Sequence, residues 1–272
     1  MAPNAKSFSA IILAGDRGLD DPVARLAEVP CKALVPVAGK AMILRVLDAL
    51  SAATEIDSYL VCGSTTRLLS QEPELGRRVA TGEVRWLENA ASPSLSARVA
   101  LDQIPPGKPV LLTTADHALL TPRMIEQFCA GASVSDCDVI AGIADADLVT
   151  NAFPDSRRTI TRLRGAHYCG CNLFAFLTPG GRQAALFWRR VEEQRKHPLK
   201  IVRTLGVTAV LRYLLGRLTL EQGLARLSAA MNVQAGAVWM SQPEAAVDVD
   251  KIEDWQLVEK ILAAQGECAA PR

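Results

Sequence analysis

Aspartates in two distant parts of the chain could bind a hard cation. Asp116 follows an apolar run at residues 110–114, and Asp248 and Asp250 alternate with valines near the end of the chain. A carboxylate at the end of a buried strand is well placed for Mg²⁺, which takes one or two carboxylates besides phosphate oxygens and water. Alternation puts Asp248 and Asp250 on one side of an extended segment, where they repel unless a cation lies between them. Capping of a turn or helix is the alternative, and we assign Asp254 to the start of the last helix.

Small and basic residues near the N-terminus could bind phosphate. An apolar run ends at Leu13 and Ala14 and leads into Gly15. A small-residue loop after a strand lets backbone N–H groups approach phosphates closely. Arg17 can bind phosphate through its planar fork, and Lys32 as a point charge. An ordinary turn with two solvated cations explains the same loop, since short glycine motifs are weak evidence.

The elements that must position these residues alternate along the first 145 residues. Apolar runs typical of buried strands lie at residues 9–14, 58–62, 84–87, 110–114 and 138–143. Helical spacing lies at residues 41–50, 96–104 and 122–130. This alternation predicts an α/β fold with an open, mostly parallel, Rossmann-like sheet covered by helices. Ligands of such sheets bind beyond the carboxyl ends of the strands, which points to the loops after Leu13, Leu87 and Thr113.

The second half of the chain has a different pattern. Strands are expected at residues 172–176 and 237–240, and a last helix at 252–264. We expect residues 1–272 to form one domain, with a mostly helical insert at about 178–232. The insert contains many basic residues: Arg182, Arg189, Arg190, Arg195, Lys196, Lys200 and Arg203.

One apolar helical face is expected within this insert. It comprises Val207, Val210, Leu211, Leu214, Leu215 and Leu218. We expect it to pack on the sheet as a lid, because most amphipathic helices face a core. The alternative is an interfacial membrane helix or a cover for a lipid-like acceptor, which leaves peripheral membrane association open.

The motifs around residues 13–18, 32–40 and 111–122 resemble the nucleotidyltransferases of the molybdenum-cofactor and sugar-phosphate type, the MobA-like NTP transferase family. The resemblance covers residues 9–145 and 236–264 best, and it implies the GT-A-like fold of nucleotide-diphospho-sugar transferases. One departure concerns the loop, where the family usually has a second glycine two residues before the arginine. Here Arg17 instead precedes Gly18, so the resemblance supports Lys32 more firmly than Arg17.

The resemblance also implies a role for each matching residue. The nucleotide-binding set comprises Leu13, Ala14, Gly15, Arg17, Lys32, Ser94, Ser96 and Asp116. Arg17 and Lys32 are its catalytic cations, and Ser94 and Ser96 contact the base or ribose unless they only cap a helix. The metal set comprises Asp116, Asp248 and Asp250, with Mg²⁺ as the cofactor. Asn172 contacts the substrate, in a loop whose His167, Cys169 and Cys171 are too few for a structural zinc site.

Composition excludes several other classes of protein. The 272 residues have a formal net charge of +1, which gives no field to attract a nucleic acid. There is no signal-peptide pattern and no apolar stretch of the length of a membrane span. The chain has seven cysteines, an odd number, scattered along the sequence. Because there is no export signal, we expect them to be reduced thiols of a cytoplasmic protein. Nothing in the sequence indicates the oligomeric state.

These observations lead to one expected reaction and three alternatives. We expect Mg²⁺-dependent transfer of a nucleoside monophosphate from a nucleoside triphosphate, CTP favoured, to a small phosphorylated sugar, alcohol or polyol, with release of pyrophosphate. One alternative is a guanylyl- or cytidylyltransferase of the molybdenum-cofactor type. The others are a metal-dependent glycosyltransferase and a non-catalytic nucleotide-binding protein.

Overall fold

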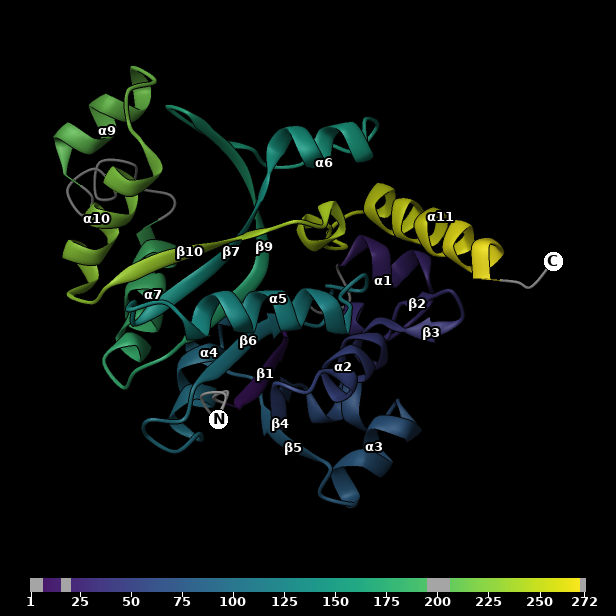
Figure 1. The fold of residues 1–272 in the computed structure, drawn as a ribbon. Helices are drawn as coiled ribbons and strands as arrows, with labels where there is room; N and C mark the ends of the chain where they lie inside the picture. The colour runs from purple at the N-terminus through teal and green to yellow at the C-terminus, as the bar shows by residue number, and fades with distance from the viewer. Residues whose placement is uncertain (1–6, 16–20, 195–205, 270–272) are drawn as a thin grey trace, which may run out of the picture.

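A computed structural model describes residues 7–15, 21–194 and 206–269 of the protein. Its main sheet contains β1 (Phe8–Ala14), β4 (Ile56–Gly63), β5 (Val84–Glu88), β6 (Val110–Thr114), β7 (Val139–Asp145), β8 (Thr161–Leu163), β9 (Ala166–Phe176) and β10 (Ala235–Met240). The strand order is β10-β7-β9-β6-β1-β4-β5 (Figure 1), and β8 pairs with β9. Two short strands, β2 (Pro36–Val37) and β3 (Lys40–Ala41), form a separate antiparallel pair.

The sheet is mixed but mostly parallel, as predicted. β1 pairs in parallel with β4 and β6, β4 with β5, and β7 with β10. β9 lies between β6 and β7 and runs antiparallel to both. The sequence pattern located the last part of β9 but not its direction, and this direction matters for the site.

Helices cover both faces of this sheet. They are α1 (Pro22–Leu26), α2 (Met42–Ala52), α3 (Pro73–Ala80), α4 (Pro93–Asp102), α5 (Pro122–Ser133), α6 (Ala146–Ala152), α7 (Ala184–Gln194), α9 (Val207–Leu214), α10 (Leu220–Met231) and α11 (Ile252–Ala269). Shorter helical turns are η2 (Lys32–Leu34), η3 (Thr65–Leu69), η4 (Gly181–Gln183) and η5 (Pro243–Ala246). Side-chain caps fix several starts; for example, Thr121 Oγ1 accepts from Met124 N, with Pro122 in the first turn of α5.

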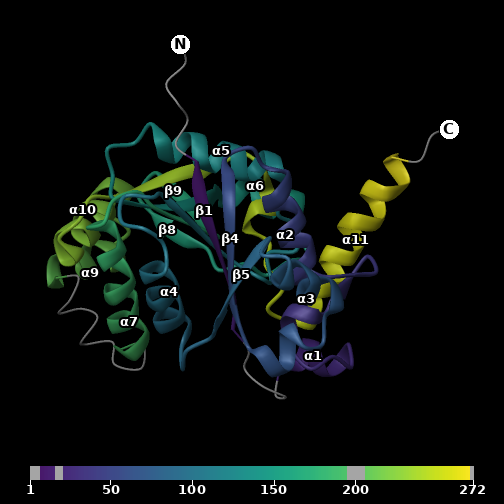
Figure 2. The same cartoon turned by 90° about the horizontal axis from the view of Figure 1, so that it is seen from below.

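The core consists of two apolar layers, one on each face of the sheet. Ile12 and other alternate residues of β1 face the layer formed with α2 and α5. Ile11 and Leu13 face the layer formed with α4 and α7. Figure 2 shows these two pairs of helices on opposite sides of β1 and β4. Since both faces of β1 are buried, its sequence is a continuous apolar run rather than an alternating one.

The apolar face predicted around residues 207–218 does not pack on the sheet, so this expectation was wrong. α9 ends at Leu214, which leaves Leu215 and Leu218 outside the helix. Leu211 and Leu214 are 52% and 73% exposed, whereas Ala209 is buried. α9 therefore contacts α10 on the side of Ala209 and Thr208, and Leu211 and Leu214 face solvent.

The basic residues of the same region are not all on the surface. Arg182 is buried and donates hydrogen bonds to four backbone carbonyls at and beyond the end of α4. It therefore satisfies carbonyl groups that a helix end leaves open. The described residues do not include Arg195, Lys196, Lys200 and Arg203, nor the side chain of Arg190.

The division of residues 1–272 into one domain with a helical insert stays a prediction.

The described helices are too short or too polar for a transmembrane segment.

Candidate functional site

Three segments meet at the carboxyl edge of the sheet. β1 and β6 end side by side there, and the N–H of Ala115 donates to the carbonyl of Leu13 at 2.9 Å. Asp116 therefore lies just beyond the end of β6. Because β9 runs antiparallel to β6, with Phe174 opposite Leu112, its residue Asn172 lies at this same edge. The direction of β9 thus brings Asn172 towards Asp116.

A backbone irregularity gives Asn172 its position. The β7–β9 register shifts between Ala141 and Ile143, and Asn172 has a φ of +46°. Asparagine tolerates this left-handed conformation better than most residues. The Asn172 side-chain amide donates to Asp248 Oδ2 at 3.0 Å. The predicted substrate residue therefore contacts a predicted metal ligand.

The segment at residues 247–250 brings the second pair of aspartates to the site. It is not a β-strand, but Val247 and Val249 are fully buried. The N–H of Val249 donates to the carbonyl of Asp116 at 3.1 Å. Asp248 and Asp250 therefore alternate with buried valines, as the pattern predicted, and lie next to Asp116.

Lys32 joins two of the three aspartates. It begins η2, and its Nζ lies 2.6 Å from Asp116 Oδ2 and 3.0 Å from Asp250 Oδ1. Burial by itself would lower the pKa of Lys32, but the Asp116 carboxylate, and after it that of Asp250, reverse the effect and raise it. Lys32 therefore remains charged at every pH at which the protein would be assayed.

Asp248 has the opposite electrostatic setting. Burial raises the pKa of its carboxyl group, and repulsion from Asp116 and Asp250 adds to the rise, against the attraction of Arg158. The three carboxylates are thus close enough to affect one another. Negative charge at Asp248 is only partly balanced by the protein itself.

Arg158 is a site residue that the sequence did not indicate. Its Nη1 donates to Asp248 Oδ1 at 2.8 Å and to the Asp248 carbonyl at 3.0 Å, and its Nη2 donates to Asp254 Oδ1 at 2.8 Å. The side chain is only 9% exposed. Arg158 therefore fixes Asp248 against the start of α11, and nothing in the sequence distinguishes it from its neighbour Arg157.

Asp254 does stabilise the start of the last helix, as predicted. Its Oδ2 accepts from the N–H groups of Asp250 and Lys251 at 3.2 and 3.0 Å. Its other oxygen accepts from Arg158. Asp254 thus links the helix start to the residue that holds Asp248.

The remaining residues of the predicted nucleotide set lie in or near β1 and α4. Leu13 and Ala14 are buried in β1, and Gly15 is exposed at its end. Arg17 lies outside the described residues. The N-cap of α4 is Ser92, whose Oγ accepts from Leu95 N, while Ser94 and Ser96 are buried within the helix.

Two neighbouring groups have a structural setting. His117 is buried, which lowers the pKa of its imidazole to about 4, so it is neutral at pH 7. Burial raises the pKa of Cys171 to about 12, so its thiol is protonated.

Across the described ranges, no group of three or more histidine, cysteine or acidic side chains is arranged to hold a metal ion.

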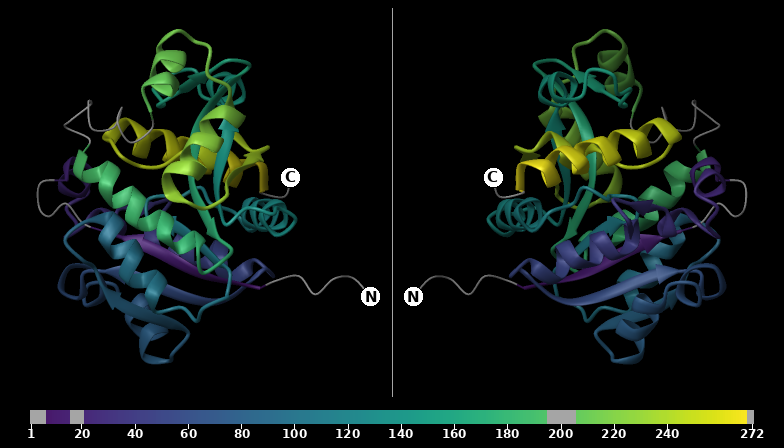
Figure 3. Two further views of the ribbon diagram at one scale, coloured as in Figure 1. Left: turned by 90° about the vertical axis from the view of Figure 1, so that its left-hand side faces the viewer. Right: turned by 90° about the vertical axis from the view of Figure 1, so that its right-hand side faces the viewer.

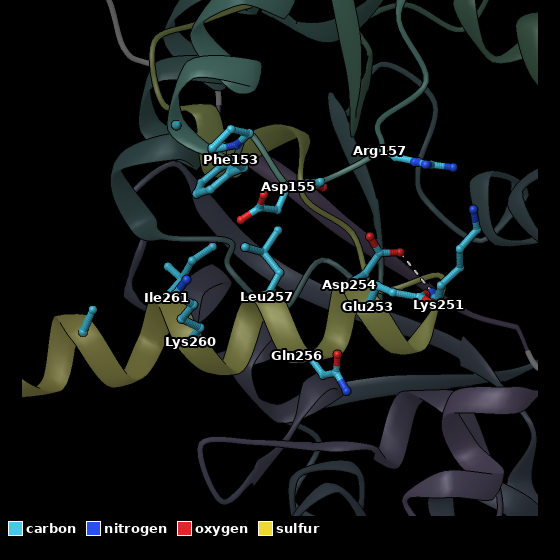
Figure 4. Close-up of a pocket in the computed structure, with 14 residues that line it drawn as sticks. Phe153, Asp155, Arg157, Lys251, Glu253, Asp254, Gln256, Leu257, Lys260 and Ile261 are labelled. Carbon is cyan, nitrogen blue, oxygen red and sulfur yellow. Dashed lines mark hydrogen bonds between the residues drawn. The ribbon is translucent and has the colours of Figure 1, made fainter.

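A groove of about 710 Å³ adjoins this cluster between the loop after α6 and one side of α11. Figure 4 shows apolar side chains, including Phe153 and Leu257, at one end and Arg157 and Lys251 at the other. Asp254, which Arg158 holds, lies between them. This groove therefore borders the side of the cluster on which Arg158 holds Asp254.

Residues 10–235 match the model of the MobA-like NTP transferase domain. The chain belongs to this family. MobA-like NTP transferases are nucleotidyltransferases, and they typically use a divalent metal. Asp248 and Asp250 lie beyond the matched residues. No protein of curated function matches the sequence directly.

Solved structures agree with the family. A hypothetical transferase from Thermus thermophilus is 31% identical, with a TM-score of 0.76 over 92% of this chain and 99% of that one. A 2-C-methyl-D-erythritol 4-phosphate cytidylyltransferase, also from Thermus thermophilus, is 14% identical, with a TM-score of 0.57 over 94% and 99%. A CMP:2-keto-3-deoxy-manno-octonic acid synthetase complexed with CTP is 13% identical, with a TM-score of 0.57 over 95% and 100%. The last two show that this MobA-like chain shares its fold with nucleotidyltransferases.

Proposed function

We propose that this nucleotidyltransferase transfers a cytidylyl group from CTP to a small phosphorylated sugar, alcohol or polyol and releases pyrophosphate, with Mg²⁺ as its divalent cation. The observation on which the proposal rests is the Lys32–Asp116 ion pair beside Asp248 at the carboxyl edge of the sheet. A cation next to two carboxylates suits a substrate that brings phosphate charge and a metal ion to one place.

The names of two similar structures support the choice of substrates. One is named as a cytidylyltransferase of a polyol phosphate, and the other is described as complexed with CTP. Their sequence identities of 14% and 13% indicate a shared fold and no more. We therefore use these names to choose the nucleotide and the acceptor class to test first.

The acceptor phosphate supplies the nucleophile in this reaction. The second pKa of a phosphate monoester is about 6, so most of it is dianionic at neutral pH. One of its oxygens forms a bond to the α-phosphorus of CTP, the bond from this phosphorus to the bridging α–β oxygen breaks, and its electron pair leaves with pyrophosphate. No covalent bond to the protein is needed, so catalysis consists of positioning and neutralisation of charge.

Lys32 neutralises charge on the triphosphate in this proposal. Its Nζ holds two carboxylate oxygens in the cluster, and one of them can be exchanged for a phosphate oxygen without leaving the amino group unpaired. On the family resemblance we assign the loop from Leu13 to Arg17 to the triphosphate. Ser94 and Ser96 are assigned to the base or ribose on the same ground.

Asp116 and Asp248 are the residues proposed to hold Mg²⁺. The raised pKa of Asp248 reflects burial and two neighbouring carboxylates, and a divalent cation would relieve this repulsion. Two protein carboxylates are also what Mg²⁺ commonly takes besides phosphate oxygens and water. When bound, the ion neutralises charge on the reacting phosphates. Asp250, which is more exposed and paired with Lys32, is the second choice after Asp248.

Arg158 and Asn172 position Asp248. They bind its two carboxylate oxygens separately, Oδ1 through the guanidinium and Oδ2 through the amide. A carboxylate held at both oxygens cannot rotate freely, so its orientation is set before substrate arrives. Asn172 additionally stays our proposed substrate contact.

The test is an assay of pyrophosphate release with Mg²⁺. Each of the four nucleoside triphosphates is combined with a panel of phosphorylated sugars, alcohols, polyols and pterins. We expect release with CTP and one sugar, alcohol or polyol phosphate. Asp116→Ala should abolish it without changing the far-UV circular dichroism, while Asp136→Ala, at an exposed aspartate outside the site, should keep the wild-type rate. An Asp116→Ala variant with full activity would contradict the metal assignment.

Other outcomes of the same assay separate the alternatives. Release only with a pterin acceptor indicates the molybdenum-cofactor branch of the family. Release of a nucleoside diphosphate from a nucleotide sugar, without pyrophosphate, indicates a glycosyltransferase. Calorimetric binding of a nucleotide with no turnover for any pair indicates a protein that only binds.

A further inference from the structure

The large apolar side chains of α9 and the turn after it face solvent on one side. Val207, Leu211, Leu214 and Leu215 are 60%, 52%, 73% and 65% exposed. The spacing of four and three residues places Val207, Leu211 and Leu214 along one helical face, and Leu215 follows in the turn after the helix. On the side of α9 that contacts the protein, Ala209 is buried. The apolar face of the helix thus points to solvent instead of to the core. Contiguous apolar patches that remain exposed mark interaction sites.

Two segments near this face contain basic residues, and the exposed Glu221 follows the first of them. Residues 206–220 include Arg212 and Arg217 and no aspartate or glutamate. The β8–β9 hairpin, residues 159–171, includes Arg162 and Arg164 and likewise no acidic residue. The hairpin lies next to the α9–α10 connection, because Arg164 N donates to the Leu218 carbonyl at 2.8 Å. All four arginines are exposed.

Aromatic side chains lie beside the same face. Tyr213 on α9 is 45% exposed and Trp239 on β10 is 43% exposed. Tyr168 packs edge-on against Trp239, with ring centroids 6.4 Å apart. Tyrosine and tryptophan are the residues that favour the boundary between water and lipid.

We propose that the α9 surface, formed by the four exposed aliphatic residues 207, 211, 214 and 215 with the exposed Arg162, Arg164 and Arg217, binds the face of a membrane that contains anionic lipid. α9 lies at the outer edge of the molecule in each view, where it can approach an extended surface (Figures 1 to 3). The apolar side chains enter the lipid boundary, and the arginines meet anionic headgroups. None of the described helices can cross a bilayer, so the contact is interfacial.

Charge favours this occupant over a second copy of the chain. Two copies joined symmetrically through the α9 surface would bring the arginines of both chains together without acidic partners from these segments. An anionic membrane instead provides opposite charge and an apolar phase at the same place. The proposal uses no residue of the Asp116–Asp248 cluster and does not depend on the nucleotide or the acceptor.

Sedimentation of the full-length protein with lipid vesicles tests the proposal. One set of vesicles is pure phosphatidylcholine, and the other is an equal mixture of phosphatidylcholine and phosphatidylglycerol. We expect binding to the mixed vesicles at low salt, weaker binding at high salt and weaker binding to the neutral vesicles. The double variant Leu211→Gln/Leu214→Gln should bind at least about tenfold more weakly. Arg164→Gln/Arg217→Gln should lose about 25-fold on the anionic vesicles, because each arginine near such a surface contributes a factor of about five.

Val134→Gln is the matched control, because Val134 is 87% exposed at the end of α5 and outside the α9 surface. It should bind vesicles like the wild type. Circular dichroism of every variant checks that a loss of binding is not a loss of fold. Equal vesicle binding by wild type and both double variants, or no binding by the wild type at low salt, would overturn the proposal. So would a wild-type dimer in sedimentation velocity that the leucine variant converts to a monomer, since a second copy would then cover this face.

Discussion

Charged side chains at the carboxyl edge of the sheet are mostly buried, whereas large apolar side chains of α9 are mostly exposed to solvent. Lys32 and Asp116 are each 15% exposed at the side chain and Arg158 is 9% exposed, while Leu214 is 73% exposed. Both arrangements depart from the usual distribution of side chains. The charges of the site are paired, so removing one partner leaves the other buried without a counter-charge, which lowers stability. The exposed Leu214 contributes little to stability, so replacing it should cost little. From this difference we expect substitutions in the site to change both stability and activity, and substitutions on the α9 surface to leave stability unchanged.

Replacing Lys32 should have the largest effect and would show both changes directly. Lys32→Met should lower kcat/KM by about 10²–10³-fold, the usual cost of losing one donor to a charged transition state. It should also lower the free energy of unfolding, because Asp116 loses its cation partner in a setting that is mostly out of water. Steady-state kinetics and urea denaturation measure the two effects. A variant that loses activity but keeps full stability would contradict the expected loss of stability.

Replacing Arg158 should have the next largest effect, because Arg158 acts by positioning Asp248. Lysine retains the positive charge, but it lacks the planar fork with which the guanidinium of Arg158 binds Asp248 and Asp254 together. Arg158→Lys should lower kcat by about 10–100-fold and weaken activation by Mg²⁺, with a smaller change in the KM for CTP. Arg157→Lys, at the exposed neighbouring arginine, is the matched control and should keep the wild-type kcat. An equal loss in both variants would reject the positioning role.

A surface ion-pair cluster provides a comparison without a functional site. Asp48 pairs with Lys40 and with Arg78, whose Nη2 lies 2.8 Å from Asp48 Oδ1. Burial alone would raise the pKa of Asp48, but hydrogen bonds from Lys40 and Arg78 outweigh it and lower the pKa. A lowered pKa in the folded state contributes stability above the unfolded value of about 4, and this contribution disappears as the pH falls through the folded value.

Asp48→Asn should therefore destabilise the protein at pH 7 and not at strongly acidic pH. Asp48 is 39% exposed at its side chain, and solvent screening limits the effect to about 0.2–1 kcal/mol. Urea denaturation of wild type and variant across this pH range measures the difference. Asp136→Asn, at an exposed aspartate, serves as the control. A constant difference between wild type and Asp48→Asn at every pH would exclude an ionic origin.

The smallest effect on stability is expected at α9. Leu214→Gln should change the free energy of unfolding by less than about 0.5 kcal/mol, the range of most surface substitutions. Leu47→Ala, at a fully buried leucine of α2, should cost about 2–5 kcal/mol in the same denaturation experiment. A large loss for Leu214→Gln would mean that the leucine is covered in solution and that α9, like the site, contributes to stability.

The central strands could be predicted because their two buried faces produce continuous apolar runs. β1, β4 and β6 match the predicted positions closely for this reason. The short helices α1, α3 and α6 were not predicted, since five to eight residues give too few turns for a clear apolar period. The direction of β9 was also hidden, because side-chain alternation is the same for parallel and antiparallel strands.

Part of the candidate site could be predicted in the same way. Asp116 and Lys32 follow recognisable motifs, and Asp248 alternates with valines whose burial the structure confirms. Arg158 could not be predicted, because it contacts Asp248 and Asp254 only when the fold places its loop beside these two residues, about 90 positions further along the chain. The predicted packing of the face around Leu211 failed because helical spacing identifies an apolar face but not its neighbour.

The sequence by itself determined the family, the α/β alternation and the residue types at the edge that we propose to bind phosphate and metal, because these depend on local spacing and on residues close together in the chain. Tertiary structure alone decided which of the distant charges meet. The antiparallel course of β9 brings Asn172 to Asp248, the loop after α6 brings Arg158, and the packing of α9 on Ala209 turns its leucines outward. Each of these depends on contacts between segments far apart in the chain, whose energies a local pattern does not contain.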